Sequence, residues 1–382
     1  MDDLKMRRKS REFLRLTRLL LGIAILLSWS CAVQNAFAQT NTKAEIIRPK
    51  VIVVVYFEVG KDTGDTPGEL QFWVERDHLD RVINVPGMSR SIRSNADGSE
   101  LAMAVGPGNI RPGVNLMAFG LDPRFDLRKS YWLLNGIAGV SPREVPLASA
   151  IWTDYVVNGD LLHEIDAREM PSDWPDGFYS LDATKPDEHP DYPPGAEGDV
   201  RNWPKDGAHS NANGSVVRLN PALLGWAFEL TRELKLPEND QMRALGARYK
   251  GYAAAQQPPR VLVGANLAGE TYWHGAKMDE WAHRWVRYST DGQATFASTA
   301  MNDSGSMAAL AALTRAGRAD WNRVLVLRTG SNFDMQAPDE TAEQSANRER
   351  HGGYTAYEPS LESAYLGGQP RREGVGCGVE AV

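Results

Sequence analysis

The stretch Lys50-Val51-Ile52-Val53-Val54-Val55-Tyr56 is a continuous run of β-branched and aromatic residues. Because it shows no alternation of polar and apolar positions, the run predicts a strand buried on both faces of a sheet. Such strands occur in α/β proteins, where helices cover both faces. The run therefore indicates an α/β fold.

Downstream segments continue the α/β pattern. Further strands are predicted at residues 101–105, 131–134, 148–157, 260–264 and 323–328. Helices are predicted at residues 114–119, 221–234, 237–252, 303–316 and 361–366, and residues 72–81 read as a short helix or an edge segment. Asn220 and Pro221 are a typical N-cap and first residue for the helix over 221–234.

Polar or glycine-rich segments follow several of these strands. Ligands of open α/β sheets bind beyond the carboxyl ends of strands, so these segments are where we expect a site. They begin at Glu58, Gly106, Asn135, Trp273, Asn302 and Ser331. The turn Gly106-Pro107-Gly108 precedes a predicted helix and could hold an anion on free N–H groups, or could be a tight structural turn.

The 382 residues are 42% hydrophobic and 24% charged, a composition typical of globular proteins. The length allows one large domain or two small ones. Only residues 19–33 are long and apolar enough to matter to a membrane. Since each spanning helix needs about 20 apolar residues, this pattern excludes a polytopic transporter.

The N-terminal segment has the three parts of a secretory signal. Seven basic residues precede an apolar core at Leu19–Leu27, and Ala36-Phe37-Ala38 resembles a cleavage site. We expect residues 1–38 to be removed, by the general or, given Arg7-Arg8, the twin-arginine export route. The protein would then be periplasmic or secreted. The alternative is an uncleaved signal anchor.

Charge and cysteine content exclude several classes of function. Without residues 1–38 the chain has 35 basic and 46 acidic residues, a net charge near −11. Such a chain is a poor nucleic-acid binder. Cys377 would be the one remaining cysteine, so neither an internal disulfide nor a cysteine metal site can form. No histidine motif has metal-binding spacing, and we expect no metal.

The domain organisation is expected to be simple. A signal peptide at 1–38 precedes one α/β domain at 49–336, and residues 337–382 form a C-terminal extension. Residues near 171–210 are rich in proline and lack periodicity. We interpret them as a surface insertion or lid.

Four motifs, in order along the chain, resemble the nucleoside phosphorylase and nucleosidase superfamily. They are Ile52–Glu58, Gly106–Ile110, Leu133–Val140 with the following Pro146–Ile151, and Arg328–Asp334. The sequence resembles most closely the purine nucleoside permease family, whose members share Phe57-Glu58, Phe125-Asp126-Leu127 and Phe333-Asp334. The resemblance covers about 49–367.

The resemblance implies a three-layer α/β/α fold with a central mixed, partly barrel-like sheet. It also implies a protein that binds purine nucleosides and cleaves their N-glycosidic bond, without a cofactor, and the N-terminal signal adds the expectation that this protein is exported. Oligomers are usual in the superfamily, so a homo-oligomer is expected. The alternative is a non-catalytic nucleoside-binding component of an uptake system, and a third reading is a fold that has lost activity. The preferred base remains open.

Residue roles follow from the resemblance position by position. Asn332 falls where the purine N7 is hydrogen-bonded, and Asp334 is a candidate acid. Asn302 and Asp303 fall where the ribose hydroxyls bind, Trp273 where an aromatic ring stacks on the base, and Glu58 near the attacking water. Further substrate contacts are expected at Gly108, Asn109, Gly136, Ala138 and Gly139.

Each of these roles has a plainer alternative. Asn302 and Asp303 could cap the next helix, Asn332 could be a turn residue, and Glu58 could be a solvated loop carboxylate.

Two departures from the superfamily favour hydrolysis over phosphorolysis. Leu134 and Ile137 stand where phosphorolytic relatives carry an arginine and a serine that hold phosphate. Carboxylates in the loop after the first strand, such as Glu58, would repel a phosphate ion. Arg111 and Arg328 could still complete a phosphate site, so phosphate stays open as a co-substrate.

Overall fold

The computed structural model describes residues 46–181, 183–189 and 216–369. The chain divides into two units, and the fold described here belongs to the second, which begins at Ile47. The predicted signal peptide lies outside the described residues, as do much of the proline-rich segment and the last residues of the chain.

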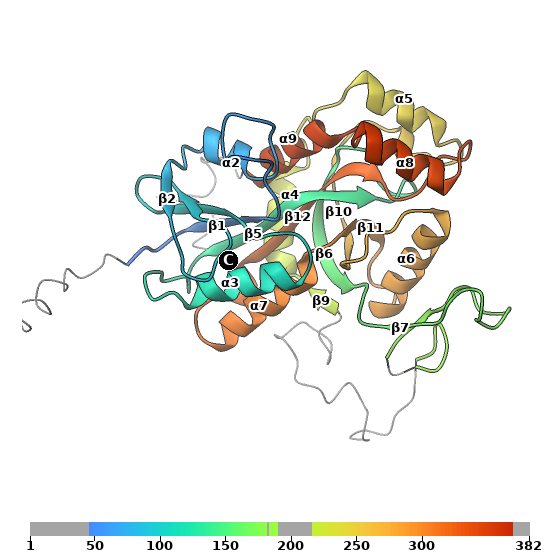
Figure 1. Ribbon diagram of the computed structural model, residues 1–382, viewed down its shortest axis with the longest axis horizontal. Helices are drawn as coiled ribbons and strands as arrows, with labels where there is room; N and C mark the ends of the chain where they lie inside the picture. The colour runs from blue at the N-terminus through green and yellow to red at the C-terminus, as the bar shows by residue number, and fades with distance from the viewer. Residues whose placement is uncertain (1–45, 182, 190–215, 370–382) are drawn as a thin grey trace, which may run out of the picture. The chain divides into compact units, whose positions relative to one another are not determined.

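The core is a ten-stranded mixed sheet with strand order β11-β10-β6-β12-β5-β1-β4-β3-β2, and β9 adds to β6 (Figure 1). Its strands are β1 (Val51–Val55), β2 (Arg81–Ile83), β3 (Ile92–Ser94), β4 (Glu100–Ala104), β5 (Tyr131–Val140), β6 (Ala150–Asn158), β9 (Val216–Arg218), β10 (Val261–Ala268), β11 (Phe296–Ala300) and β12 (Val324–Phe333). A separate ribbon joins β7 (His163–Glu164) to β8 (Phe178–Tyr179).

Part of this sheet closes into a five-stranded barrel. The end of β5 pairs antiparallel with β11, with Val140 opposite Ser298 and Gly139 opposite Thr299, so that β5, β12, β6, β10 and β11 form a ring. The expected loop at residues 135–140 is therefore strand. After β1 ends, β5 continues beside β12, and small residues at Gly136, Ala138 and Gly139 suit a strand that curves.

Helices cover both faces of the sheet. They are α2 (Gln71–Arg76), α3 (Ile110–Leu121), α4 (Pro221–Thr231), α5 (Asp240–Arg248), α6 (Ala276–Ser289), α7 (Asp303–Arg315), α8 (Ala342–Gly352) and α9 (Tyr357–Gly368), with short 3-10 turns η2 (Ala254–Gln256) and η3 (Trp321–Arg323). The Asn220 side chain accepts hydrogen bonds from the N–H groups of Ala222 and Leu223, which confirms the predicted cap of α4.

β1 contributes side chains to two hydrophobic cores, because its residues are apolar at every position. Ile52 and Val54 belong to the core under α3 and α7, whereas Val53 and Val55 belong to the core under α2 and α4. Figure 1 shows α3 and α7 on the opposite side of the sheet from α2. Alternate residues of a strand point to opposite faces, so one apolar run fills both layers. The three-layer α/β/α fold with a partly barrel-like mixed sheet is thus confirmed.

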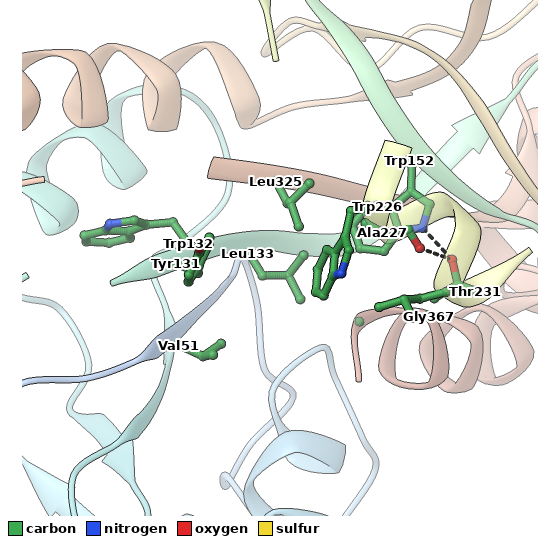
Figure 2. A pocket seen from close by; sticks show the side chains of 12 residues that line it. Val51, Tyr131, Trp132, Leu133, Trp152, Trp226, Ala227, Thr231, Leu325 and Gly367 are labelled. Carbon is green, nitrogen blue, oxygen red and sulfur yellow. Dashed lines mark hydrogen bonds between the residues drawn. The ribbon is translucent and has the colours of Figure 1, made fainter. Parts of the chain in front are cut away.

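A small apolar cavity of about 60 Å³ lies between α4, α9 and the first residues of β1 and β5 (Figure 2). The Thr231 hydroxyl in its lining already accepts a hydrogen bond from Trp152 Nε1 at 2.8 Å and donates one to the Ala227 carbonyl at 2.7 Å. The other polar side-chain atoms of the lining belong to Tyr131 and to tryptophan indoles, among them the buried Trp132 Nε1, which has no hydrogen-bond partner among the described residues. The lining contains no carboxylate, amine or guanidinium group. Chemistry is therefore expected at the other ends of these strands.

None of the helices in the described ranges combines the length and hydrophobicity needed to cross a membrane.

Candidate functional site

A pocket forms where the ends of β5, β10, β11 and β12 meet at the closure of the barrel. It is lined by Gly139, Gly269, Thr271, Tyr272, Trp273, Thr299, Ala300, Met301, Asn332 and Asp334. We call it the central pocket. Four residues predicted from the sequence, at 139, 273, 332 and 334, meet here although they are far apart along the chain.

The central pocket itself encloses about 30 Å³, but two larger cavities share its walls. A cavity of about 810 Å³ lies beyond Tyr272 and is lined mainly by α8 and the segment up to Tyr357. A second cavity, of about 600 Å³, shares Trp273 and is lined by Phe178 and Trp281. Together they offer room of the size that small-molecule sites have.

Asn332 lies in β12, so its interpretation as a turn residue is not supported. Its Nδ2 donates to Tyr272 Oη at 3.2 Å and to Glu349 Oε2 at 3.3 Å, while Ser331 Oγ donates to its Oδ1 at 2.9 Å. Burial raises the pKa of Glu349 to about 7. Asn332 is therefore connected to a carboxyl group on α8 that titrates near neutrality.

Asp334 is the most unusual carboxyl group of the pocket. It is 1% exposed, and no N–H or hydroxyl group among the described residues donates to either of its side-chain oxygens. Burial, and then the negative charge of Asp279, raise its pKa well above the usual range. These surroundings favour the protonated form of the carboxyl group over the ionised form, and a protonated carboxyl group can donate a hydrogen bond.

Behind the pocket lies a fully buried ion pair between Asp303 of α7 and Arg328 of β12. Arg328 Nε donates to Asp303 Oδ2 at 2.9 Å, and its Nη2 donates to Oδ1. Tyr56 Oη donates to the same Oδ1 at 2.9 Å, and Asn266 Nδ2 donates to Oδ2 at 2.7 Å. The carboxylate predicted to bind ribose is thus engaged by four internal donors.

A second buried carboxylate, Glu69, lies next to this ion pair. It accepts hydrogen bonds from the N–H groups of Tyr56 at 2.7 Å and Ile137 at 2.8 Å. A side chain at Gly136 would collide with Glu69 and with Arg328, so only glycine fits between them. Burial raises the pKa of Glu69 to about 7, opposed chiefly by the charge of Arg328.

The alternative that the Asn302 side chain caps the next helix is not supported by the structure. Asn302 is the residue before α7, but its side chain makes no capping bond there. Its Oδ1 accepts instead from the Gly108 N–H at 2.8 Å. Asn109 Oδ1 likewise accepts from the Gly305 N–H at 3.0 Å, so the two turns hold each other.

The glycine-rich turn before α3 is occupied by a carboxylate from within the chain. Glu270 Oε1 accepts from the N–H groups of Asn109 at 2.5 Å and Ile110 at 3.1 Å. Gly108 has a φ of +84°, and a Cβ there would lie 3.0 Å from Glu270 Oε1, so glycine suits this position. The N–H groups that could have cradled an external anion are already used.

Glu58 has a similar structural use at the start of α2. Its two carboxylate oxygens accept from the N–H groups of Val59 at 2.8 Å, Gly68 at 2.5 Å, Leu70 at 2.9 Å and Gln71 at 2.7 Å. It is neither a freely solvated carboxylate nor directed at the central pocket. It fixes the loop between β1 and α2.

Several functional candidates carried no signal in the sequence. Glu69, Asp279, Thr299 and Glu349 lie outside every motif, while Tyr272 was visible only as a neighbour of Trp273. Ala138 contributes through its carbonyl, which accepts from Ser331 Oγ at 3.1 Å. In the described part of the chain, no cluster of three or more side chains could bind a metal ion.

The fold and the site define an α/β protein with a polar and aromatic pocket at the closure of its barrel. The model of the family described as purine nucleoside permease (NUP) matches residues 48–375, and the chain belongs to this family. A protein of Schizosaccharomyces pombe named as a probable purine nucleoside permease is 26% identical over 305 residues, covering 78% of this chain and 82% of that protein. A purine nucleoside permease of Candida albicans is 25% identical over 345 residues, covering 88% and 78%.

Solved structures with a related arrangement include a futalosine hydrolase of Helicobacter pylori, with 11% identity and a TM-score of 0.45, covering 84% of this chain and 96% of that one. A 5'-methylthioadenosine/S-adenosylhomocysteine nucleosidase of Streptococcus pneumoniae has 12% identity and a TM-score of 0.44, covering 83% and 97%.

Proposed function

We propose that the protein binds purine nucleosides in the central pocket and hydrolyses their N-glycosidic bond. The observation that carries this proposal is the convergence of Asn332, Asp334 and Trp273 on one pocket, where Asp334 has no donor and keeps its proton. A purine leaves readily only when its negative charge is neutralised by a proton or a hydrogen bond. Trp273 supplies an aromatic face next to both groups.

Hydrolysis is preferred to phosphorolysis because most of the groups that could hold phosphate are engaged inside the protein, whereas Arg111 is exposed. Arg328 is fully buried against Asp303. The N–H groups before α3 bind Glu270, and in the loop after β1 the Glu58 carboxylate binds backbone N–H groups while Arg90 and Arg93 pair with Asp62. A phosphate ion would have to displace these internal partners.

One observation favours the alternative of a nucleoside-binding protein without catalysis. Glu58, which the resemblance places near the attacking water, has both oxygens on backbone N–H groups. A binder needs the aromatic and polar contacts of the pocket but no group that activates water. In this alternative the protein would deliver nucleosides to a separate uptake system. Export through residues 1–38 and homo-oligomer formation remain part of either proposal.

Purified protein incubated with adenosine, guanosine and inosine tests these alternatives. We expect free base to appear without phosphate, as measured by chromatography. The matched variant Asp334→Asn keeps the size of the side chain but not its acidic proton, and should lose base release while retaining nucleoside binding in calorimetry. Base release that requires phosphate would overturn hydrolysis, and tight binding without turnover would support the transport alternative.

A further inference from the structure

Asp334 faces a second buried carboxyl group, Asp279 of α6. The side chains are 1% and 0% exposed. The Gly275 N–H donates to the Asp334 carbonyl at 2.8 Å and the Asp279 N–H donates to the Gly275 carbonyl at 3.0 Å, while the Asp334 N–H donates to the Val140 carbonyl, next to the serine that bonds Asp279. Two carboxylates buried side by side repel each other strongly, so the pair is stable when it shares one proton. The question is which of the two holds it.

The partners of the two groups differ sharply. Ser141 Oγ donates to Asp279 Oδ1 at 2.6 Å, and Arg143 Nε donates to Asp279 Oδ2 at 2.5 Å. No donor among the described residues reaches Asp334. Hydrogen bonds from an arginine and a hydroxyl stabilise the ionised form, which places the negative charge on Asp279. The proton therefore belongs on Asp334, the member of the pair that lines the central pocket.

A route to solvent leads from Asp279 through His283. His283 Nε2 lies 3.1 Å from Ser141 Oγ and 3.7 Å from Asp279 Oδ1, and its side chain is 21% exposed. The other charged groups acting on this cluster are Glu144, Glu280 and Arg287, with Glu280 3.8 Å from Arg143. Burial lowers the pKa of His283, so the ring is neutral and can pass a proton.

We propose that Asp279 is a positioning residue that keeps the proton on Asp334 and directs it at the purine bound in the central pocket. This inference rests on the proposed function. As the N-glycosidic bond breaks, its electron pair goes to the purine, and Asp334 gives its proton to that base. Water adds to the sugar and releases a proton to solvent, and a proton returning through His283 and Ser141 restores Asp334.

Two variants should shift the alkaline limb of the pH profile of kcat in opposite directions. Asp279→Asn removes the neighbouring charge and offers an N–H to Asp334, so the limb should move down by about one pH unit or more. Arg143→Gln removes the cation that neutralises the pair, so the limb should move up. KM should change little in both. If the variants lose activity without these opposite shifts, the proposal is overturned. A residue with a merely structural role would lower kcat without moving the alkaline limb of its pH profile.

Infrared spectroscopy of the free protein separates this inference from the proposed function. We expect the spectrum of the unmodified protein minus that of Asp334→Asn to contain the carbonyl band of a protonated carboxylic acid at neutral pH, and the spectrum of Asp279→Asn minus that of Asp334→Asn to lack it. The subtraction removes the bands of Glu69 and Glu349, which have a pKa of about 7 and are partly protonated at this pH. Asp122→Asn is the matched control, because Asp122 is buried and pairs with Arg124 but faces no second carboxylate. A missing band in the first of these difference spectra would overturn the inference. If the band is present but the protein cleaves no nucleoside, the inference that Asp334 is protonated stands. The proposed hydrolysis is then overturned.

Discussion

The ion pair between Asp303 and Arg328 can be tested one residue at a time. Asp303→Ala would leave a fully buried guanidinium without its carboxylate, and removing one partner of such a pair costs about 3–5 kcal/mol. We therefore expect the free energy of unfolding in urea to fall by this amount. The double variant Asp303→Ala, Arg328→Met should recover part of the loss. An unchanged unfolding free energy together with weaker nucleoside binding would instead support the predicted ribose contact.

Glu58 offers a second test at the residue scale. Glu58→Gln keeps one carbonyl oxygen but sets an amide group against backbone N–H donors, so we expect a loss of about 1–3 kcal/mol in unfolding free energy. Hydrogen exchange should speed up at the N–H groups of Leu70 and Gln71. Glu233→Gln is the control, since the Glu233 side chain is 89% exposed. Normal exchange combined with lost turnover would favour a role at the attacking water.

Some residues of the candidate site could be predicted from the sequence, and others could not. Asn332, Asp334 and Trp273 could be placed in one site because the resemblance orders their motifs along the chain. Glu69 and Asp279 could not, because a buried carboxylate outside a motif looks the same in sequence as one on the surface. Their burial depends on Arg328 and Arg143, which the fold brings to them from distant segments.

At the scale of elements, the carboxyl end of β5 decides whether the central pocket is open. A Cβ at Gly139 would lie 3.2 Å from Thr299 Cγ2, 3.7 Å from Asp334 Cβ and 3.8 Å from Asn332 Nδ2. Gly139→Val should fill this space and weaken nucleoside binding by about tenfold or more, which corresponds to about 1.4 kcal/mol.

Gly225→Ala in α4 is the control for this change, because nothing lies within 4 Å of a Cβ there. This substitution should leave binding intact and stabilise the helix by about 0.5–1 kcal/mol. Calorimetry with adenosine and urea unfolding measure both effects. Unaltered binding by Gly139→Val would place the nucleoside elsewhere.

The elements themselves were predictable where composition is distinctive. β1, β4 and β6 follow from apolar runs, and α4 follows from its N-cap Asn220 and the proline after it. β5 and β12 continue beyond their predicted ends, because pairing between them extends past the apolar core into residues that read as loop. α8 was missed because its helical signal is a capping box, in which Thr341 and Gln344 bond each other's backbone, in an otherwise polar segment.

At the scale of the whole molecule, the closure of the barrel explains which parts of the fold could be predicted from the sequence and which could not. The pairing of β5 with β11 is a contact between residues about 160 positions apart, estimated from the register of Val140 and Ser298. No local pattern encodes such a contact, and β11 carries no apolar run comparable to β1. The closed, barrel-like sheet was predicted from the family resemblance. The residue patterns alone predicted only an open α/β sheet.

The stability of the whole fold should depend on pH through Glu69. Its pKa is raised from 4.5 to about 7 by burial, so the folded state favours the protonated form. This contribution to the unfolding free energy is fully present below pH 4.5 and is lost as the pH rises through about 7. A shift of this size corresponds to about 3 kcal/mol.

Glu69→Gln cannot titrate and should remove this pH dependence. Urea unfolding, followed by tryptophan fluorescence between pH 4.5 and pH 8, should therefore show the unmodified protein losing stability relative to the variant as the pH rises. Glu349→Gln is the parallel case, because burial also raises the pKa of Glu349 to about 7, and its effect should add to that of Glu69. If the unfolding free energies of Glu69→Gln and of the unmodified protein change with pH in parallel, Glu69 stays ionised in the folded protein. In that case Arg328 and the surrounding N–H groups outweigh the burial of the carboxylate.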